Sequence, residues 1–301
     1  MPRPEVNRSG EMEVFVSVVD LGGLSPAARA HRVTPSGVSK LISRLEARIG
    51  ARLLNRSTRT LHLTPEGRIF YERCVGILSD IGEAESCATA SEAPSGRLSV
   101  SATRPIGTHI LLPLVSEFLS RNPKVTLDIY LVDAIGDIRR ERTDVIVTSG
   151  PLRNSHTVAR KLGETGMIIV GSPSYLETFG TPKTPEDLER HNRLGLAHIR
   201  PIEGWPLMKG TEQMCVPLVG NTRIGDGESL RELVISGLGL ARLARFQVKK
   251  DIEAGRLVPV LEEINAGDRE EIHAVYAGEG GHLPVRVRAF LDFLSKKVSI
   301  S

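Results

Sequence analysis

Two helix-start signals that lie nine residues apart constrain this chain more than any other feature of its sequence. Ser25-Pro26 and Thr34-Pro35 each offer a hydroxyl side chain as the N-cap, followed by a proline at the first helical position. Three alanines follow Pro26 and keep the first helix thin, so that another helix can cross it closely. Two short helices joined by so tight a turn predict a helix-turn-helix.

The second of these helices, within residues 33–49, combines an apolar anchor with a small polar outer face. Its large apolar residues recur at helical spacing and are Val38, Leu41, Ile42, Leu45 and Ile49. The opposite face carries glycine, serine, lysine and arginine side chains. Gly37 is unusual on that face, because glycine weakens a helix by roughly 1 kcal/mol relative to alanine. Its other role would be to let the backbone approach DNA closely.

The segments on either side complete a small domain. Residues 11–20 predict a helix that ends at Gly22-Gly23, with Met12, Phe15, Val16 and Val19 on its apolar face. Residues 52–64 alternate around a basic turn, which predicts a β-hairpin, the wing of a winged helix-turn-helix.

Positive charge is concentrated in this part of the chain. Residues 25–59 hold eight Lys or Arg and one acid, Glu46, whereas the remainder holds 31 basic and 35 acidic residues. A basic module followed by a mildly acidic body predicts one end that binds nucleic acid and one that does not.

Thr64-Pro65 begins a long helix, predicted over residues 65–91. A heptad seam runs along it and consists of Phe70, Cys74, Ile77, Ile81, Ala84 and Ala88. A lone helix of roughly 40 Å would expose this seam, whereas a two-chain coiled coil hides it and brings two copies of Cys74 together. We expect a homodimer through residues 65–91; packing of the helix against its own domain is the alternative.

Strands and helices alternate after a hinge of small residues at 89–96. The predicted strands are 97–102, 125–132, 144–150, 157–162, 166–172, 239–244 and 273–277, and the predicted helices are 108–121, 173–179, 185–191, 227–239 and 285–294. This alternation favours parallel sheets, in two α/β subdomains with a cleft between them.

The predicted domains follow from these patterns. Residues 1–64 form the winged helix-turn-helix, 65–91 the linker helix, and 92–301 an α/β domain. Subdomain I of this domain takes about 96–163 and 270–301, and subdomain II about 164–269.

The sequence lacks the motifs of several other functions. It contains no GxSxG, Walker loop or HExxH motif, and its eight histidines are scattered without metal-ligand spacing. Its three cysteines form no CxxC pair, its N-terminus has no apolar signal region, and no run is long enough for a membrane span. We expect a cytoplasmic protein that is not an enzyme and has no metal or cofactor. A small-molecule binding module or an α/β enzyme without DNA function is the alternative.

The order of these features resembles the LysR-type transcriptional regulators. GGLSPAARAHRVTPSGVSKLISRLEARIGARLLNRSTRTLHLTPEG is similar to their winged helix-turn-helix. GRLSVSATRPIGTHILLPLVSEFLSRNP, GTPKTPEDLERH, ESLRELVISGLGLARL and AGRLVPVL resemble their periplasmic-binding-protein-like effector domain. The resemblance extends from Glu11 to about Val298, with departures at Gly22-Gly23-Leu24 and Gly37. It implies a sequence-specific DNA-binding regulator, modulated by a small-molecule effector, whose dimers associate into tetramers.

The N-terminal residues of the second helix of a helix-turn-helix lie nearest the base edges. Here these are Pro35, Ser36, Ser39 and Lys40. Lys40 can donate to guanine, the serines suit either base type, and Pro35 can lie against a thymine methyl. Phosphate contacts are expected from the surrounding residues, which are Arg29, Arg32, Ser43, Arg44, Arg56 and Arg59. Each of these charges, taken singly, is equally consistent with a solvated surface residue.

The roles of two further arginines are open. Arg48 and Arg52 could pair with Glu46 or cap the helix, instead of contacting DNA.

The resemblance also implies an effector site between the two subdomains. In open α/β sheets, ligands sit beyond the carboxyl ends of the strands. The residues predicted there are Thr103, Arg104, Thr108, Ser149, His198, Arg200 and Asp226. The guanidinium of Arg104 would suit a carboxylate effector, and pairing of Arg104 with a nearby acid is the alternative.

Overall fold

The computed structural model of the chain describes residues 7–56, 61–88, 93–133, 143–150, 157–197, 204–277, 283–298 and 300. The backbone forms two compact units, Met1–Glu92 and Ala93–Ser301. In the part of the chain that is described, no helix is both long enough and apolar enough to cross a membrane.

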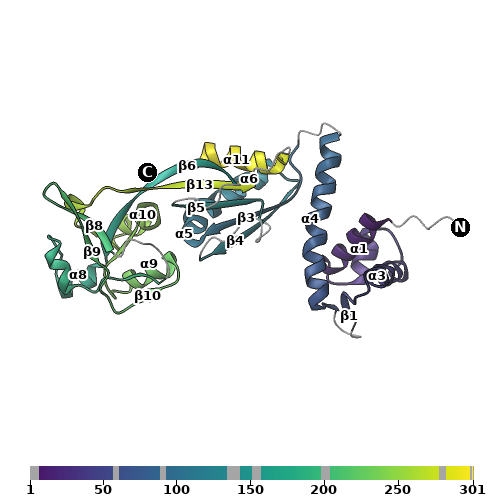
Figure 1. The fold of residues 1–301 in the computed structure, drawn as a ribbon, viewed down its shortest axis with the longest axis horizontal. Helices are drawn as coiled ribbons and strands as arrows, with labels where there is room; N and C mark the ends of the chain where they lie inside the picture. Colours follow the sequence, from purple (N-terminus) through teal and green to yellow (C-terminus); the bar gives the residue numbers. More distant parts are fainter. Residues whose placement is uncertain are drawn as a thin grey trace. The chain divides into compact units, whose positions relative to one another are not determined.

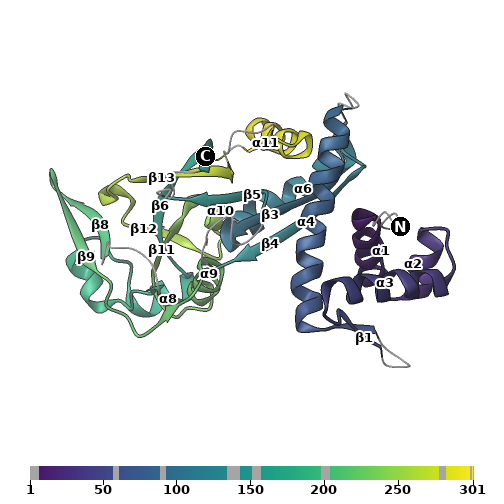
Figure 2. The same ribbon diagram turned by 45° about the vertical axis from the view of Figure 1, so that its right-hand side comes forward.

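The first unit is a winged helix-turn-helix followed by a long helix, which confirms the predicted architecture. Its elements are α1 (Arg8–Asp20), α2 (Leu24–Ala30), α3 (Pro35–Ile49), β1 (Leu54–Arg56), β2 (Leu61–Leu63) and α4 (Pro65–Ala88). Strands β1 and β2 pair antiparallel, with Leu54 opposite Leu63, and form the wing. In Figures 1 and 2, α1 lies beside α4, and α3 packs against α1.

Local capping explains where α3 begins and ends. The hydroxyl of Thr34 accepts a hydrogen bond from the N–H of Gly37 at 3.1 Å, and Pro35 occupies the first turn, as predicted. Gly50 ends the helix in the left-handed conformation, with φ 77°, which glycine adopts without strain.

The start of α2 differs from the prediction that Ser25 is its N-cap. The helix begins at Leu24, and Gly23 occupies the N-cap without a side-chain hydrogen bond. Pro26 therefore lies at the third helical position. It is tolerated there because the first N–H groups of a helix have no intrahelical partner.

The core of this unit is aliphatic and joins all of its helices. Ala27 and Ala28 are buried at the crossing of α2, which agrees with the expectation that small side chains allow close packing. The buried set is Val14, Phe15, Val18, Ala27, Ala28, Val38, Ile42, Leu45, Leu53, Leu54 and Cys74. The apolar face of α3 is therefore committed to the core, and its polar face is left for solvent or a partner.

The first two residues of the predicted α4 seam, Phe70 and Cys74, pack against their own unit, which the prediction gave as the alternative to a second chain. Phe70 packs against this core, with its ring 5.6 Å from that of Phe15. Cys74 is fully buried, so it is not available to meet a second copy of itself. The exposed apolar side chains at this end of α4 are Ile69, 62% exposed, and Ile77, 42% exposed.

Burial also controls the chemistry of Cys74. It raises the pKa of the thiol to about 11, and the nearby charge of Arg48 offsets this only in part. Because the thiolate is the reactive form, Cys74 is an inert core residue.

The second unit is an α/β domain. Its first half contains β3 (Gly96–Thr103), α5 (Arg104–Ile106), the π-helical turn η1 (Gly107–Leu111), α6 (Leu112–Arg121), β4 (Val125–Val132), β5 (Val145–Ser149) and β6 (Thr157–Gly171). There follow α8 (Pro173–Phe179), η2 (Glu186–Arg190), β7 (Gly195–Leu196), β8 (Gly204–Lys209), β9 (Glu212–Pro217) and β10 (Arg223–Ile224). The last elements are α9 (Gly227–Ile235), β11 (Ala241–Ala244), α10 (Arg245–Glu253), β12 (Val258–Val260), η3 (Glu262–Ile264), β13 (Arg269–Ala277) and α11 (Val285–Lys297).

The main sheet is mixed, which corrects the expectation of parallel sheets. Its strand order is β11-β6-β13-β5-β3-β4, and β12 pairs with β6 on the edge opposite β11. Strand β3 runs parallel to β4 and β5, whereas β13 runs antiparallel to β5 and β6. The two strands predicted at 157–162 and 166–172 are one continuous strand, β6, because β13 pairs along most of its length.

Strands β6 and β13 connect the two subdomains, as Figures 1 and 2 show. One core lies at the β3 end, where the rings of Phe118 in α6 and Phe290 in α11 pack edge to face with their centroids 5.0 Å apart. Two further hydrophobic clusters lie around the other half of β6. One contains Trp205 and Leu240, and the other contains Val234. The register between β6 and β13 shifts at Ile272/His273, between the two halves.

Candidate functional site

The outer face of α3 is the first candidate site. Pro35, Ser36, Lys40 and Arg44 are exposed on it, and Ser39 is half-buried at its side. Ser36, Lys40 and Arg44 are four residues apart, so they follow one line along the helix. The structure therefore brings the predicted base-contacting residues together at the start of this face.

A small hydrogen-bonded group fixes the first turn. The hydroxyls of Thr34 and Ser36 lie 3.0 Å apart, and Thr34 also caps the N–H of Gly37. A Cβ at position 37 would lie 3.2 Å from the Thr34 oxygen, so a side chain there would press on the cap. Glycine at this position therefore leaves the Thr34 cap undisturbed. This cap lies at the end of the helix that is predicted to meet DNA.

Basic side chains surround this face. Arg29 and Arg32 are exposed at the turn before α3. Within the described ranges, the side chains of Arg29, Lys40 and Arg44 form no ion pair or hydrogen bond, so they can meet an anionic partner. Arg32 has φ 53°, a left-handed conformation that is costly for a residue with a side chain.

The two arginines predicted to contact DNA from the wing are Arg56 and Arg59. Arg56 is the last residue of β1, and Arg59 lies outside the described residues. Ser43 is exposed one turn beyond Ser39 and makes a contact within the chain.

Two residues near this face, Glu46 and Arg48, hold the unit together through contacts that were not predicted. Arg48 donates to a buried carboxylate oxygen of Glu11 at 2.9 and 3.1 Å, and this ion pair links α3 to α1. Glu46 accepts hydrogen bonds from the backbone N–H groups of Leu53 and Leu54, at 2.8 and 3.1 Å. Glu46 therefore fixes the start of the wing, and Arg48 is bound to Glu11 across 37 positions of the chain.

The second candidate site lies at the edge of the main sheet where β3 and β5 end. Thr103 is the last residue of β3 and the N-cap of α5, and Ser149 ends β5. Arg104 and Thr108 follow in the next turns and are exposed. The Nε of Arg104 donates to an Asp133 oxygen at 2.5 Å, and this contact raises the pKa of the guanidinium. The local acid considered as an alternative partner is therefore Asp133.

Asp226 faces this edge from the other subdomain. It caps α9 by accepting from the N–H groups of Glu228 and Ser229, both at 3.0 Å, and from the Ser229 hydroxyl at 2.6 Å. A Cβ at Gly227 would lie 2.9 Å from Pro105, so the start of α9 packs tightly against α5.

The neighbours of Asp226 change the pKa of its carboxyl group. Burial by itself raises the pKa of Asp226, but the hydrogen bonds from Ser229 and Glu228 and the charge of Arg104 lower it overall. Arg104 and Asp226, predicted separately from sequence, therefore interact across the two subdomains.

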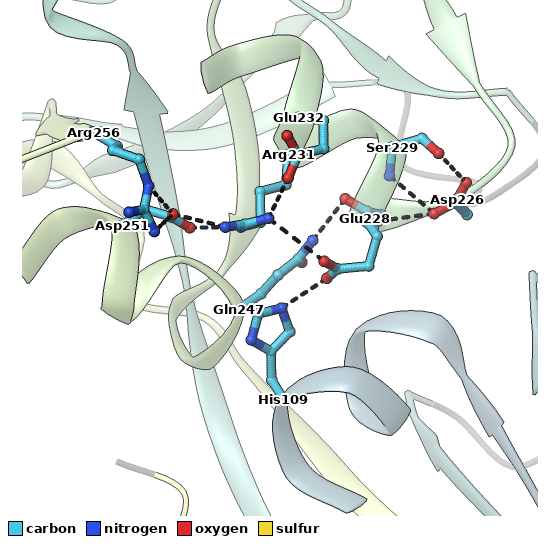
Figure 3. A network of polar contacts seen from close by, with 10 residues as sticks. His109, Asp226, Glu228, Ser229, Arg231, Glu232, Gln247, Asp251 and Arg256 are labelled. Atoms are coloured by element: carbon cyan, nitrogen blue, oxygen red, sulfur yellow. Dashed lines mark hydrogen bonds and ion pairs between the residues drawn. The ribbon is translucent and has the colours of Figure 1, made fainter. Parts of the chain in front are cut away.

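A polar chain that the sequence analysis missed continues from this point (Figure 3). The Nε2 of His109, in η1, lies 2.9 Å from a Glu228 oxygen in α9. The carbonyl of Gly227 accepts from the Gln247 amide at 2.6 Å. His109 is placed by the π-turn, which forms where Gly107 leaves room for Leu131: a Cβ at Gly107 would lie 2.1 Å from that side chain.

This series of polar contacts ends at the buried carboxylate of Asp251. Arg231 donates to the two oxygens of Asp251 at 2.5 and 2.7 Å, and Arg256 donates to one of them at 2.5 and 2.8 Å. Asp251 is fully buried. Only the helical spacing of Glu228 and Arg231 was a sequence signal for this chain, because its other pairs join residues of different elements.

Two predicted effector residues lie outside the description. His198 and Arg200 belong to residues 198–203, which the structure does not describe. Their part in the site stays a prediction.

Known families and structures match both units. The family model described as "Bacterial regulatory helix-turn-helix protein, lysR family" matches residues 10–68, and "LysR substrate binding domain" matches residues 91–299. The transcriptional regulator CrgA of Neisseria meningitidis serogroup B is 34% identical over 293 residues, which cover 96% of this chain and 97% of CrgA. A transcriptional repressor of Pseudomonas aeruginosa (strain UCBPP-PA14) is 32% identical, over 94% of this chain and 90% of the repressor.

Two full-length structures extend this likeness to the fold. The structure of CrgA aligns with a TM-score of 0.64 and covers 97% of this chain and 99% of its own. The Vibrio cholerae virulence activator AphB aligns with a TM-score of 0.59 at 27% identity, covering 95% and 97% of the two chains.

Proposed function

This chain belongs to the LysR family of transcriptional regulators, and from that premise we propose which of its residues read DNA and which receive the effector. It carries the family's DNA-binding helix-turn-helix and the domain with which the family binds small-molecule effectors. Members of this family are regulators rather than enzymes. We propose domain boundaries of 1–64, 65–91 and 92–301.

The observation that carries the DNA proposal is the outer face of α3. Val38, Ile42 and Leu45 on its apolar side are fully buried. Ser36 and Lys40 are exposed one turn apart at its N-terminal end. This end enters the major groove in a helix-turn-helix. We assign base contacts to Pro35, Ser36, Ser39 and Lys40. Phosphate contacts are assigned to the flanking residues, which are Arg29, Arg32, Ser43, Arg44, Arg56 and Arg59.

Lys40→Ala and Arg44→Ala form a matched pair that tests this assignment. A lysine that donates to a guanine edge contributes about 1 kcal/mol or more of discrimination. We therefore expect Lys40→Ala to change the order of preference among operator variants by roughly fivefold or more. A phosphate contact carries no sequence information, so Arg44→Ala should weaken binding to all sequences alike and reduce the salt slope by about 1.

Fluorescence anisotropy with a panel of single-base operator variants, at several salt concentrations, measures both quantities. An equal loss on every sequence for Lys40→Ala would remove it from the base-contacting set. A change of sequence preference for Arg44→Ala would contradict its role as a phosphate contact.

We propose that the effector is a small carboxylate that replaces Asp133 on Arg104. Both side chains of this ion pair are about half exposed, 45% and 52%. An ion pair so exposed is worth about 0–1 kcal/mol, so a ligand carboxylate can displace it at little cost. Thr103, Thr108, Ser149, His198, Arg200 and Asp226 are the further residues proposed to line the site.

Calorimetric titration with benzoate and with short aliphatic acids tests the effector proposal. Asp133→Asn removes the competing carboxylate, so we expect acid binding to tighten about two- to fivefold. Arg104→Gln removes the charge-assisted contact and should weaken it by tenfold or more. A neutral analogue, benzyl alcohol, serves as control: if it binds as well as benzoate, or if Arg104→Gln leaves benzoate binding unchanged, the proposal fails.

We propose that the chain forms a dimer through residues 65–91 and a tetramer through its effector domains, in the cytoplasm where its DNA target lies. The exposed Ile69 and Ile77 on α4 support the dimer, because a second α4 would cover them. Sedimentation velocity of the full-length chain measures the assembly. A monomer at micromolar concentration would contradict it.

A further inference from the structure

Arg193 is a buried cation in subdomain II. It lies between η2 and β7 and is 7% exposed. Its Nε is closed to solvent and has no hydrogen-bond partner. Among the described residues, no carboxylate forms an ion pair with its guanidinium. Buried charges in proteins are almost always paired, because an unpaired one costs several kcal/mol.

The backbone holds Arg193 firmly in this position. Its N–H donates to the carbonyl of Val219 at 3.4 Å, and it pairs with Leu240 in a parallel bridge. A Cβ at Gly220 would lie 2.1 Å from the Arg193 carbonyl oxygen, so glycine is required for this close approach. The arginine is therefore built into the fold, and its side chain is not a surface residue that happens to fold inward.

The neighbours of Arg193 are polar but uncharged. Burial lowers the pKa of His191, a nearby Asp187 opposes this, and the charge of Arg193 lowers it further, so the neutral form of the ring is favoured. The Tyr175 hydroxyl lies 3.2 Å from the His191 Nδ1 and accepts from the Asn192 N–H at 2.9 Å. Arg193, His191 and Tyr175 together supply a cation and polar ring groups in one buried place.

Asp187 does not neutralise Arg193. Its carboxylate is occupied by the backbone N–H groups of Lys183 and Thr184, both at 2.9 Å, and these bonds lower its pKa. Asp187 is also only partly buried. Among the described residues, the positive charge of Arg193 is thus left without a carboxylate partner and can meet a ligand.

This place is separate from the proposed effector site. Leu240, the bridge partner of Arg193, follows the C-terminal end of α9, whereas Asp226 caps its N-terminus. The nine residues of α9 span about 13 Å. Likewise, Arg193 precedes β7, while Asp226 follows β10, which runs parallel to β7.

We infer that Arg193 marks a second anion-binding site, in subdomain II, for a small oxyanion such as phosphate or a carboxylate. The planar guanidinium fork matches both groups. Neutral His191 adds a polar ring beside it without adding a second charge. The inference rests on the contacts of Arg193 alone and holds whether or not the effector binds at Arg104.

Thermal unfolding of the full-length protein tests the inference. The single tryptophan, Trp205, is buried in the same subdomain, so its fluorescence reports unfolding there. Sodium phosphate, sulfate and acetate are compared with sodium chloride at equal ionic strength, so that screening is constant. We expect at least one oxyanion to raise the Tm of the wild type in a saturable way. The anion with the larger effect identifies a tetrahedral or a carboxylate ligand.

Arg193→Met and Arg104→Gln separate this site from the effector site. Arg193→Met should weaken the oxyanion response by tenfold or more, while Arg104→Gln should retain it. No response in the wild type, or an equal response in Arg193→Met, overturns the inference; loss of the response in Arg104→Gln assigns the anion to the effector site instead.

A second variant keeps the test decisive if Arg193→Met does not fold. Arg193→Lys retains the charge but lacks the guanidinium fork. It should weaken the binding of the same oxyanion severalfold, and an unchanged affinity overturns the inference.

Discussion

Replacement of Gly67 by alanine is expected to lower the free energy of unfolding of the winged helix-turn-helix by about 3 kcal/mol or more. A Cβ at this position would lie 2.0 Å from the carbonyl oxygen of Leu53, which is backbone and cannot turn aside. That carbonyl already accepts the N–H of Thr64 at 3.0 Å, and the Thr64 hydroxyl caps the Gly67 N–H at 2.9 Å. The new methyl group would thus separate the wing from α4.

Gly82→Ala on the same helix is the matched control for Gly67→Ala. A Cβ at Gly82 meets nothing within 4 Å, so the change should stabilise α4 by about 1 kcal/mol through helix propensity alone. Hydrogen exchange of the α3 and α4 amides in the full-length chain measures both variants. Equal protection in Gly67→Ala and Gly82→Ala would contradict the steric argument.

Replacement of Asp251 by asparagine is expected to destabilise the effector domain by about 3–5 kcal/mol. Asp251 is fully buried and accepts from both Arg231 and Arg256 (Figure 3). Asparagine keeps the shape but removes the fully buried charge that Arg231 shares with Arg256. Arg231 then keeps only Glu232, which is 66% exposed, and Glu228 at 3.8 Å. Urea unfolding followed by Trp205 fluorescence measures the loss.

Arg256→Met is the control for Asp251→Asn. The Arg256 side chain is half exposed, and its removal leaves the pair of Arg231 and Asp251 intact, so we expect a cost of about 1 kcal/mol or less. Equal costs for the two variants would show that burial of the Asp251 charge is not the cause.

The pH dependence gives the Asp251 prediction a second readout. Burial alone raises the pKa of Asp251, but the hydrogen bonds and charges of Arg231 and Arg256 lower it overall. A lowered pKa contributes stability that is fully present above the unfolded value of about 3.9 and is lost as the pH falls through the folded value. The difference in free energy of unfolding between wild type and Asp251→Asn should therefore be constant above about pH 5. It should decrease as the pH falls below about 4.

The sequence predicted the features that depend on residues within one helical turn or along one strand. Thr34 and Pro35 fix the start of α3 wherever the helix lies, and the apolar spacing from Val38 to Leu45 fixes which face is buried. The candidate base-contacting residues follow from these two facts. Strand positions were predicted on the same basis, although the two segments of β6 were separated because nothing local joins them.

Contacts between distant segments were not predictable in this way. Whether a charge pairs within the chain depends on which element the fold brings to it, and pairing energies fall off over a few ångströms. The sequence left Arg48 open between DNA, Glu46 and a helix cap, but it binds Glu11. Arg104 meets Asp133. The link from His109 to Glu228 joins residues 119 positions apart.

The sequence by itself determined the architecture, the family and the DNA-facing side of α3, because capping, periodicity and charge are local properties. Only the tertiary structure decided that Cys74 belongs to the core and that Gly67 is required by the Leu53 carbonyl. It also decided that Arg193 is buried and that its Nε has no hydrogen-bond partner among the described residues. Burial and pairing are properties of the packed chain, and no spacing along the sequence encodes them.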